Sequence, residues 1–370
     1  KRTAQLTLQR FLKSFATTKG FFNMSLSRET VSVLNHHFSA LAKTYSVSAA
    51  DISTGFNPDG AVLPKFFHNG LLALSSNDEH QLTDINIVMV EDRQGEAFLW
   101  AGGEPCTSRT NMDVKDRETT SLLSNPSKYA TAETQCDIHI PYGTISKWAV
   151  ASKSKQYSKD AQKNFGMKYT TFVQKRVCSD VLNIGFNGVS VDAETTPSAK
   201  LTNVNKGWTQ VVKDQKPSQI MSNPLTIGVN GDYANLDAAV ADLLDQKIDI
   251  ALRDDLVCII SDNLIADERW RFYNSVEFHT EKKNTSDTFT HFGGLDSVRI
   301  PNFPDNTIVI TSLDNLSVYI KESTPYRQIE PNAKRNRVED YQHREEAYIV
   351  ENMAKYAALT SLTPIGEPEV

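Results

Sequence analysis

Cysteine is scarce in this chain, and its few cysteines lie far apart. Only four occur among the 370 residues. No two of them form a CxxC pair or stand at another spacing typical of zinc ligands, so a cysteine-based metal site is not indicated. Scattered cysteines are typical of proteins in a reducing compartment. The sequence therefore predicts thiols and no disulfide framework at Cys106, Cys136, Cys178 and Cys258.

Long hydrophobic runs are also missing. No window approaches the roughly 18 consecutive apolar residues of a membrane-spanning helix, so we expect no membrane partner. Residues 1–23 are basic and contain several phenylalanines, but Lys13 and Lys19 interrupt the apolar stretch that a signal peptide needs. The chain starts without Met, and Met24 precedes a new pattern. Residues 1–23 are therefore either an upstream extension or a non-native start.

An excess of basic charge, the usual feature of a dedicated nucleic-acid binder, is absent as well. The chain has 39 Lys and Arg against 45 Asp and Glu, a formal net charge of −6. This balance does not exclude lining a compartment that holds DNA. The 39% hydrophobic residues are ample for packed cores, and the length indicates two or three structural units.

No short catalytic motif is present: we find no GxSxG, P-loop, GxGxxG or HExxH. The pair His36-His37 lies on a predicted helix, where adjacent side chains diverge, so solvated histidines are expected. Asp254-Asp255 precedes a buried strand and indicates a charged turn. The basic cluster Lys334–Arg337 indicates a surface turn or a subunit contact. The sequence thus predicts no enzyme, with no catalytic residue, no metal and no cofactor.

Apolar periodicity predicts both helices and strands. Leu34, Phe38 and Leu41 share one face of a helix at 26–44. A helix is also expected after Tyr233, with Asp232 as its N-cap. The stretch 190–216 is expected to be a loop. Further helices are predicted at 61–76, 147–184 and 263–276, and strands at 85–90, 97–101, 136–142, 256–260, 307–311, 316–320 and within 337–357.

Two features of this pattern concern the organisation of the chain. The polar stretch 102–135 lacks periodicity and is flanked by strands, which suggests a two-stranded arm reaching away from the body. Residues 217–305 read as a compact α/β unit. Between the strands at 307–311 and 316–320, Ser312–Asn315 carries a hairpin turn signal.

A set of motifs in the carboxyl half resembles a known family. These motifs occur in register with the major capsid proteins of peduovirus-type tailed bacteriophages, and the resemblance extends from about residue 27 to 359. INIVMV at 85–90 and the helix around 35–43 also look like family segments. The motifs are GFNGV at 185–189, GDYANLD at 231–237, VRIPNFP at 298–304, LDNLSVY at 313–319 and RVEDY at 337–341.

The resemblance implies an α+β fold of the Hong Kong 97 capsid type. It would comprise an N-terminal arm, an extended E-loop, a peripheral domain with a long spine helix, and an α/β axial domain. The implied boundaries are 1–60 for the N-terminal arm or pro-segment, 61–92 for the start of the peripheral domain, 93–138 for the E-loop, 139–216 for the peripheral domain with its spine helix, 217–305 for the axial domain, and 306–370 for peripheral-domain strands and the C-terminus.

The implied function is that of the shell subunit, which self-assembles into the icosahedral capsid around double-stranded phage DNA. Implied partners are further copies of the chain in pentamers and hexamers, a scaffolding protein with its protease, the portal protein, and the packaged DNA bound non-specifically. The subunit would assemble in the host cytoplasm and reside in the virion. A tail sheath or baseplate component, or an enzyme without a recognisable motif, stays open as an alternative. The host, the triangulation number and the choice between phage and satellite shell stay open too.

The family also implies proteolytic maturation. In its members a protease linked to the scaffold removes an amino-terminal segment. The stretch Ala50–Phe56 resembles the end of that segment, which places the cut between Phe56 and Asn57. Residues on both sides of the bond, Ser53, Gly55, Pro58, Asp59 and Gly60, predict an exposed linker, which a protease can bind. An interdomain linker that is never cut is the alternative.

Overall fold

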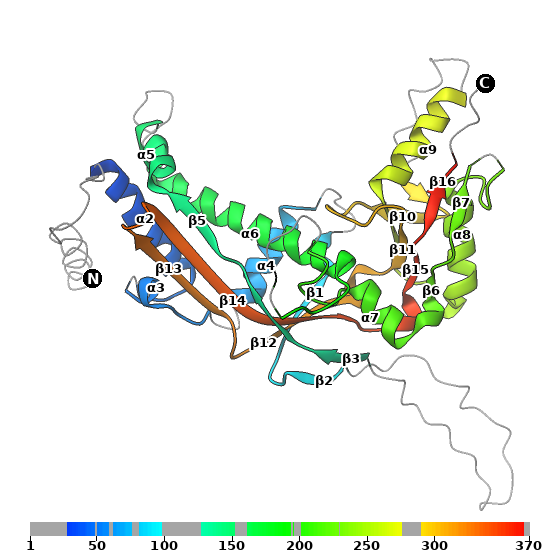
Figure 1. The fold of residues 1–370 in the computed structure, drawn as a ribbon, viewed down its shortest axis with the longest axis horizontal. Coiled ribbons are helices and arrows are strands. Elements are labelled where there is room, and N and C mark those ends of the chain that lie inside the picture. The colour runs from blue at the N-terminus through cyan, green and yellow to red at the C-terminus, as the bar shows by residue number, and fades with distance from the viewer. Residues whose placement is uncertain are drawn as a thin grey trace, which may run out of the picture. The chain divides into compact units, whose positions relative to one another are not determined.

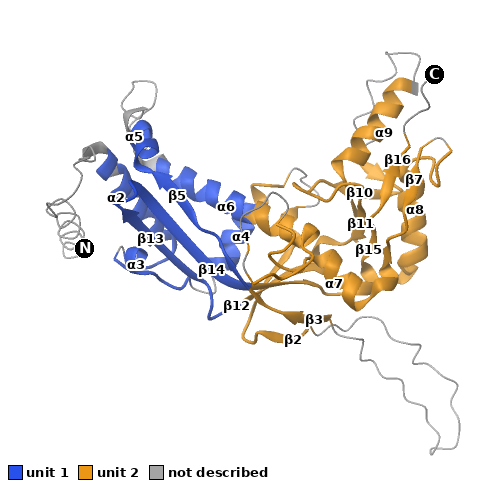
Figure 2. Cartoon of the chain, in the orientation of Figure 1, with its two compact units in different colours: residues 1–70, 133–177, 321–345 blue, residues 71–132, 178–320, 346–370 orange. Residues whose placement is uncertain are grey.

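The chain folds as a mixture of helices and strands that divides into two compact units. The computed structural model describes residues 28–48, 50–58, 62–75, 81–97, 127–151, 161–193, 195, 201–228, 230–275 and 290–365. Unit 1 comprises residues 1–70, 133–177 and 321–345, and unit 2 comprises 71–132, 178–320 and 346–370 (Figure 2). Residues 1–23, Cys106 and most of the predicted arm, 98–126, lie outside the described residues.

Unit 1 is built on strands that pair with β14 (Arg337–Val350). β13 (Tyr326–Asn332) pairs with it antiparallel, from Tyr326 opposite His343 to Asn332 opposite Arg337. β5 (Ile138–Pro141) pairs with it antiparallel as well, and β4 (Ala132–Gln135) is a further partner. The helices of this unit are α2 (Arg28–Thr44), α3 (Asp51–Thr54), α4 (Val62–Leu72), α5 (Tyr142–Ala151) and the first part of α6 (Ala161–Asn187) (Figure 1).

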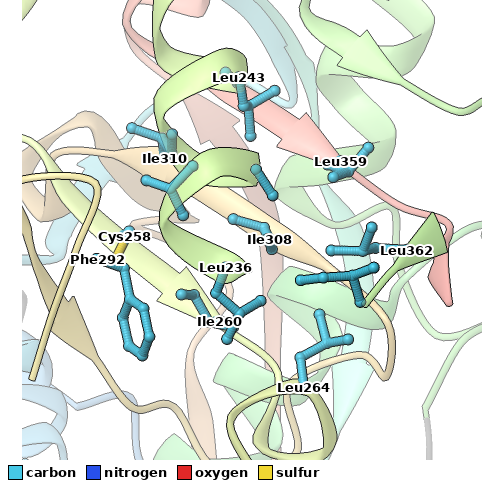
Figure 3. Packing of buried hydrophobic residues seen from close by; sticks show 14 of the residues in the cluster. Leu236, Leu243, Cys258, Ile260, Leu264, Phe292, Ile308, Ile310, Leu359 and Leu362 are labelled. Carbon is cyan, nitrogen blue, oxygen red and sulfur yellow. The ribbon is translucent and has the colours of Figure 1, made fainter. Parts of the chain in front are cut away.

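Unit 2 contains an α/β core with a large cluster of buried apolar side chains. Its sheet has the order β6-β15-β11-β8-β10-β9, in which β8 (Val257–Ile260) runs parallel to β10 (Leu295–Val298) and antiparallel to β11 (Ile308–Thr311). Leu236 and Leu243 of α8 (Leu236–Lys247) pack with Ile308 and Ile310 of β11 (Figure 3). The remaining elements of this core are α9 (Asp262–Ser275), β6 (Ile220–Met221), β9 (His291–Phe292) and β15 (Ala357–Leu359), and β7 (Leu225–Ile227) pairs with β16 (Leu362–Pro364).

A second part of unit 2 places strands around the end of β14. β12 (Leu316–Lys321) pairs with β14 antiparallel from Leu316 opposite Val350 to Ile320 opposite Glu346, and β1 (Asn86–Val90) lies beside β12. β2 (Gln94–Ala97) and β3 (Ser127–Ala130) form an antiparallel pair at the two ends of the predicted arm. The strand predicted at 97–101 therefore begins earlier, at Gln94. The arm itself stays a prediction.

The hairpin predicted at Ser312–Asn315 is wrong. A short 3-10 helix at Leu313–Asn315 separates β11 from β12, and the two strands belong to different sheets. All four residues of β11 are buried, and the strand pairs with β8 on one side and β15 on the other. Asn315 donates from Nδ2 to Oγ1 of Thr311 and to the carbonyl of Asn352, which fixes the redirection of the chain.

Helix boundaries differ from the predictions in three places. The single helix predicted at 147–184 is two helices, α5 and α6, with residues 152–160 between them outside the described part. The predicted loop at 190–216 contains α7 (Trp208–Gln215), whose Trp208, Val211 and Val212 are buried at helical spacing. The N-cap of α8 is Asn235, whose side chain accepts a bond from the Ala238 amide, and not Asp232. The Asp232 carboxylate instead accepts from the amide and hydroxyl of Thr226, which closes the loop after β7.

Candidate processing site

The predicted scissile bond begins at a buried residue. The side chain of Phe56 is 8% exposed, and its ring lies 5.2 Å from that of Tyr45, centroid to centroid. Its backbone forms a bridge to Arg327 of β13: the Phe56 amide donates to the Arg327 carbonyl at 3.0 Å, and the Arg327 amide donates back at 2.9 Å. Asn57, on the other side of the bond, is exposed.

The exposed linker predicted around this bond is wrong on the side before it, because Ser53 and Gly55 are only partly exposed and their segment is packed. Asp51–Thr54 form the short helix α3, and Ile52 is fully buried. Ser48 and Asp51 exchange bonds that stabilise the helix start: the Ser48 amide donates to the Asp51 carboxylate, and the Asp51 amide donates to the Ser48 hydroxyl. This reciprocal pair closes the turn that leads into α3, whose N-cap is Ala50. Asp59 and Gly60, the rest of the predicted linker, lie outside the described residues.

The helix before the bond is part of the core of unit 1. Leu34 and Leu41 of α2 are buried as their spacing predicted, and Phe38 packs against the same cluster. They contact the side chains that other stretches of unit 1 supply. These are Tyr142 and Ile145 from α5, Phe165 from α6, Ile329 from β13 and Val338 from β14. Residues 28–56 therefore contribute a large share of this core.

Arg327, whose backbone forms the bridge to Phe56, also forms a buried ion pair through its side chain. Arg327 donates from Nε and an Nη to the two carboxylate oxygens of Asp340, at 3.0 and 2.8 Å, and both side chains are almost fully buried. Arg327 also donates to the hydroxyl of Tyr45, and the hydroxyl of Tyr169 donates to Asp340 at 2.9 Å. Burial works against the charged guanidinium, but the Asp340 carboxylate outweighs it and raises the pKa of Arg327. Two tyrosines thus complete the shell of a pair that would otherwise be costly to bury.

His37 is buried beside this pair, whereas solvated histidines were predicted at 36 and 37. Its ring lies edge-on to Tyr169 at 4.9 Å, and neither ring nitrogen has a hydrogen-bond partner. Burial, followed by the positive charge of Arg327, lowers the pKa of His37 to about 4, against the opposing effect of Asp340. The prediction holds for His36, which is exposed.

The other residues singled out in the sequence do not come together. Asp254 and Asp255 are exposed in the turn before β8, with Asp255 at a positive φ of 55°. The cluster Lys334–Arg337 forms the turn between β13 and β14, where Arg335 and Arg337 pair with Glu339. Among the described residues, no group of His, Cys, Asp and Glu is arranged to bind a metal ion. No helix in this part of the chain combines the length and apolarity needed to cross a membrane.

The pair Arg327–Asp340 was not anticipated from the sequence. The register places Arg327 opposite Gln342 and Asp340 opposite Ile329, so the two residues become diagonal neighbours only once β13 and β14 have paired. Both strands carry several polar and charged residues without a clear polar–apolar alternation, so the sequence does not mark Arg327 or Asp340 as buried. The sequence offers only a weak signal, Asp340 itself, an acidic residue within the stretch 337–357 where a strand was predicted.

Comparisons with known proteins agree with the fold. The family model described as "Phage major capsid protein, P2 family" matches residues 33–362. The chain is 28% identical over 351 residues to the capsid proteins of Escherichia phage P2, covering 89% of this chain and 93% of that sequence. It is 24% identical over 360 residues to the major capsid protein of Serratia phage KSP20, covering 92% and 98%.

A solved structure supports the same assignment. The procapsid of satellite phage P4, determined with its size determination protein, contains a chain that superposes with a TM-score of 0.59 at 28% identity. The match covers 76% of this chain and 94% of that one. The α+β architecture is thus of the Hong Kong 97 type, as the motifs implied. With its family profile spanning nearly the whole sequence, this chain belongs to the P2 family of phage major capsid proteins.

Proposed function

We propose that this major capsid protein self-assembles, as pentamers and hexamers, into an icosahedral shell around double-stranded phage DNA. The observation that carries the proposal is the family match over residues 33–362, which includes both compact units. Scaffolding protein, its protease and the portal protein would act as partners during assembly in the host cytoplasm. The net charge of −6 favours non-specific enclosure of DNA over binding through a basic surface.

Exposed apolar side chains on α6 support a role in subunit contacts. Phe172 is 65% exposed and Met167 is 66% exposed, although both are large and apolar. A side chain of this size and apolarity that stays exposed in the isolated subunit can be covered by a neighbouring subunit. Substituting Phe172→Glu should therefore reduce the yield of shells without changing the melting temperature of the subunit. The control is Lys175→Glu, which introduces the same side chain at another exposed position of α6.

Electron microscopy of the chain co-expressed with its scaffold tests the proposal. Closed shells are the expected result. Tubes would favour a tail sheath, and soluble particles without order would favour an enzyme or another non-capsid role. An enzymatic activity of the isolated subunit would also count against the proposal, in which the chain has no catalytic function.

The arm at residues 93–138 is proposed to pack on neighbouring subunits as the E-loop. The antiparallel pairing of β2 and β3 at its base supports this, because it brings the two ends of the stretch together. Ordering a polar loop costs roughly 1–2 kcal/mol per residue, which contacts between subunits would have to offset. Amide exchange in this stretch should be rapid in the unassembled subunit and slow in the shell. Slow exchange in both states would contradict the proposal.

Maturation by a cut between Phe56 and Asn57 is part of the proposed function. Residues Ala50–Phe56 look like the end of the segment that the family removes, and the exposed Asn57 lies at the accessible side of the bond. Mass spectrometry of subunits from mature particles should find a chain that begins at Asn57. A dominant species that retains residues 24–56 would show that the chain is not processed there.

A further inference from the structure

We propose that the Phe56–Asn57 bond is latent in the folded subunit, and that a protease can reach it only after residues 51–56 separate from β13. The inference rests on the proposed processing at this bond and concerns its regulation. It follows from how the residues before the bond are held, which the sequence alone did not reveal.

The conformation of residues 51–56 is unsuited to a protease. Proteolysis concentrates in exposed, extended segments whose backbone groups are available for new bonds. Here Asp51–Thr54 are helical, and Ile52 and Phe56 are buried. Both backbone polar groups of Phe56 are already bonded to Arg327 of β13. A protease cleft would have to replace this strand and extract an aromatic side chain from the core.

Side chains of β13 cover this segment from outside. The ring of Tyr326 lies against Gly55, so closely that a Cβ at Gly55 would sit 1.8 Å from its hydroxyl oxygen. Gly55 has a φ of +99°, a conformation that favours glycine because glycine has no Cβ. The close approach of Tyr326 requires glycine for that same reason. The Tyr326 hydroxyl donates to Oε1 of Gln328 at 3.0 Å and also lies 3.4 Å from the Thr54 carbonyl oxygen, and Gln328 donates from Nε2 to the Ser53 carbonyl at 3.0 Å.

These covering contacts come from residues outside the stretch that a protease would read. Tyr326 is partly solvent-exposed, at 37%, so its removal should loosen residues 51–56 without opening the core beneath. On the other side of the bond Asn57 is exposed. The Phe56–Asn57 bond is therefore protected only by the packing of the residues before it. Local separation of residues 51–56 from β13 is enough to expose the bond. Contacts made during assembly could supply that separation, which would couple cutting to shell formation.

Chymotrypsin provides a test that does not depend on the phage protease, because it cuts after aromatic residues. The probe is the rate at which a product beginning at Asn57 forms from the purified, unassembled subunit. The reference is a synthetic peptide of residues 47–62, in which Phe56 is the single aromatic residue. We expect the subunit to be cut at least about a hundredfold more slowly than the peptide, since cleavage must wait for local opening.

The variant Tyr326→Ala should raise the cutting rate at Phe56 by about tenfold, because it removes a packed ring and a hydrogen bond from the cover. The control Tyr273→Ala removes a similarly exposed tyrosine, at 41%, from α9 of unit 2 and should leave the rate unchanged. Amide exchange at Phe56 should increase in the first variant alone, with an unchanged melting temperature showing that the fold is retained.

The outcomes separate the inference from the function on which it rests. Equal cutting rates in subunit and peptide, or equal rates in the two variants, would overturn latency while leaving processing intact. Mature particles whose subunits keep residues before Asn57 would overturn the processing, even if chymotrypsin finds the bond protected. Slow cutting of the subunit together with a processed chain in particles supports both.

Discussion

The two cores of this protein are built on different principles. The core of unit 2 is a cluster of apolar residues, each at most 6% exposed, drawn from 227–310 and 357–362. The core of unit 1 combines residues from 33–56, 142–165 and 329–338. Beside it are the buried pair Arg327–Asp340 and His37, whose ring nitrogens have no hydrogen-bond partner. Both clusters are apolar, but only the cluster of unit 1 has a buried ion pair beside it and includes a segment proposed to be cut away.

This difference has a physical consequence for maturation. Apolar packing is cooperative and non-directional, so the core of unit 2 should persist through any change at the amino terminus. A buried charge pair is stable only with all of its partners in place, and Tyr45, one of those partners, precedes the proposed cut. Unit 1 is therefore the part of the subunit that processing can alter.

The largest effect is expected from breaking the buried pair of unit 1. Asp340→Asn removes the charge with little change in shape and leaves Arg327 buried without a counter-ion. The free energy of unfolding should fall by about 3–5 kcal/mol. The control is Asp214→Asn, which breaks an exposed pair with Lys206 and should cost less than about 1 kcal/mol. Urea unfolding of the unassembled subunits measures both, and equal losses would contradict the distinction.

The second-largest loss of stability is expected from a cavity in the core of unit 2. Ile308 is fully buried at the centre of the sheet (Figure 3), so Ile308→Ala should destabilise unit 2 by about 2–5 kcal/mol. Ile250→Ala is the matched control, because that side chain is 80% exposed and its loss should stay within about 0.5 kcal/mol. Urea unfolding followed by amide exchange in β8 would locate the effect. A loss below 1 kcal/mol for Ile308→Ala would show that the core can collapse around the gap.

The pH dependence of unit 1 should sharpen the contrast further. The pKa of His37 falls from 6.5 to about 4 on folding, so the unfolded chain takes up the proton first as the pH drops. The free energy of unfolding is therefore unaffected by His37 above pH 6.5. It decreases as the pH falls from 6.5 towards 4, by at most about 3 kcal/mol. His37→Phe should remove this part of the pH dependence. His36→Phe, at the exposed neighbouring position, should retain it, and identical pH profiles for the two variants would refute the assignment.

The smallest effect concerns a helix start in unit 2. The Asn235 side chain accepts a bond from the Ala238 amide at 2.9 Å. Asn235→Ala should cost about 1 kcal/mol by leaving that amide without its cap. Asn274→Ala, in the exposed last turn of α9, should show no such loss. Thermal unfolding resolves the two, and an unchanged melting temperature for Asn235→Ala would assign the helix start to other contacts.

The sequence was most informative where structure is local. Helical spacing correctly placed Leu34 and Leu41 in the core, and the apolar run before Ser261 correctly predicted β8. The turn signal at Ser312–Asn315 failed because strand pairing is non-local. A buried strand such as β11 needs partners on both edges, and it finds them in β8 and β15. Local turn chemistry does not indicate which sheet the next strand joins.

The processing site shows the same limit. Gly and Pro around Phe56 indicate a linker, and the contacts that make the segment a packed one, such as the bridge to Arg327, come from far along the chain. The position of the bond came from the family motif, and its environment came from tertiary contacts that no periodicity encodes. Likewise, His37 looks like any helical histidine until Phe165 and Tyr169 enclose it.

Amide exchange on a chain that begins at Asn57, compared with the full chain, tests the division between the two cores most directly. Protection in β8, β11 and β15 of unit 2 should be the same in both chains. In unit 1, β13 and α5 should lose protection when residues before Asn57 are missing, because Ile329 and Ile145 lose the side chains that cover them. Unchanged protection in β13, or an equal loss in β8, would contradict the account.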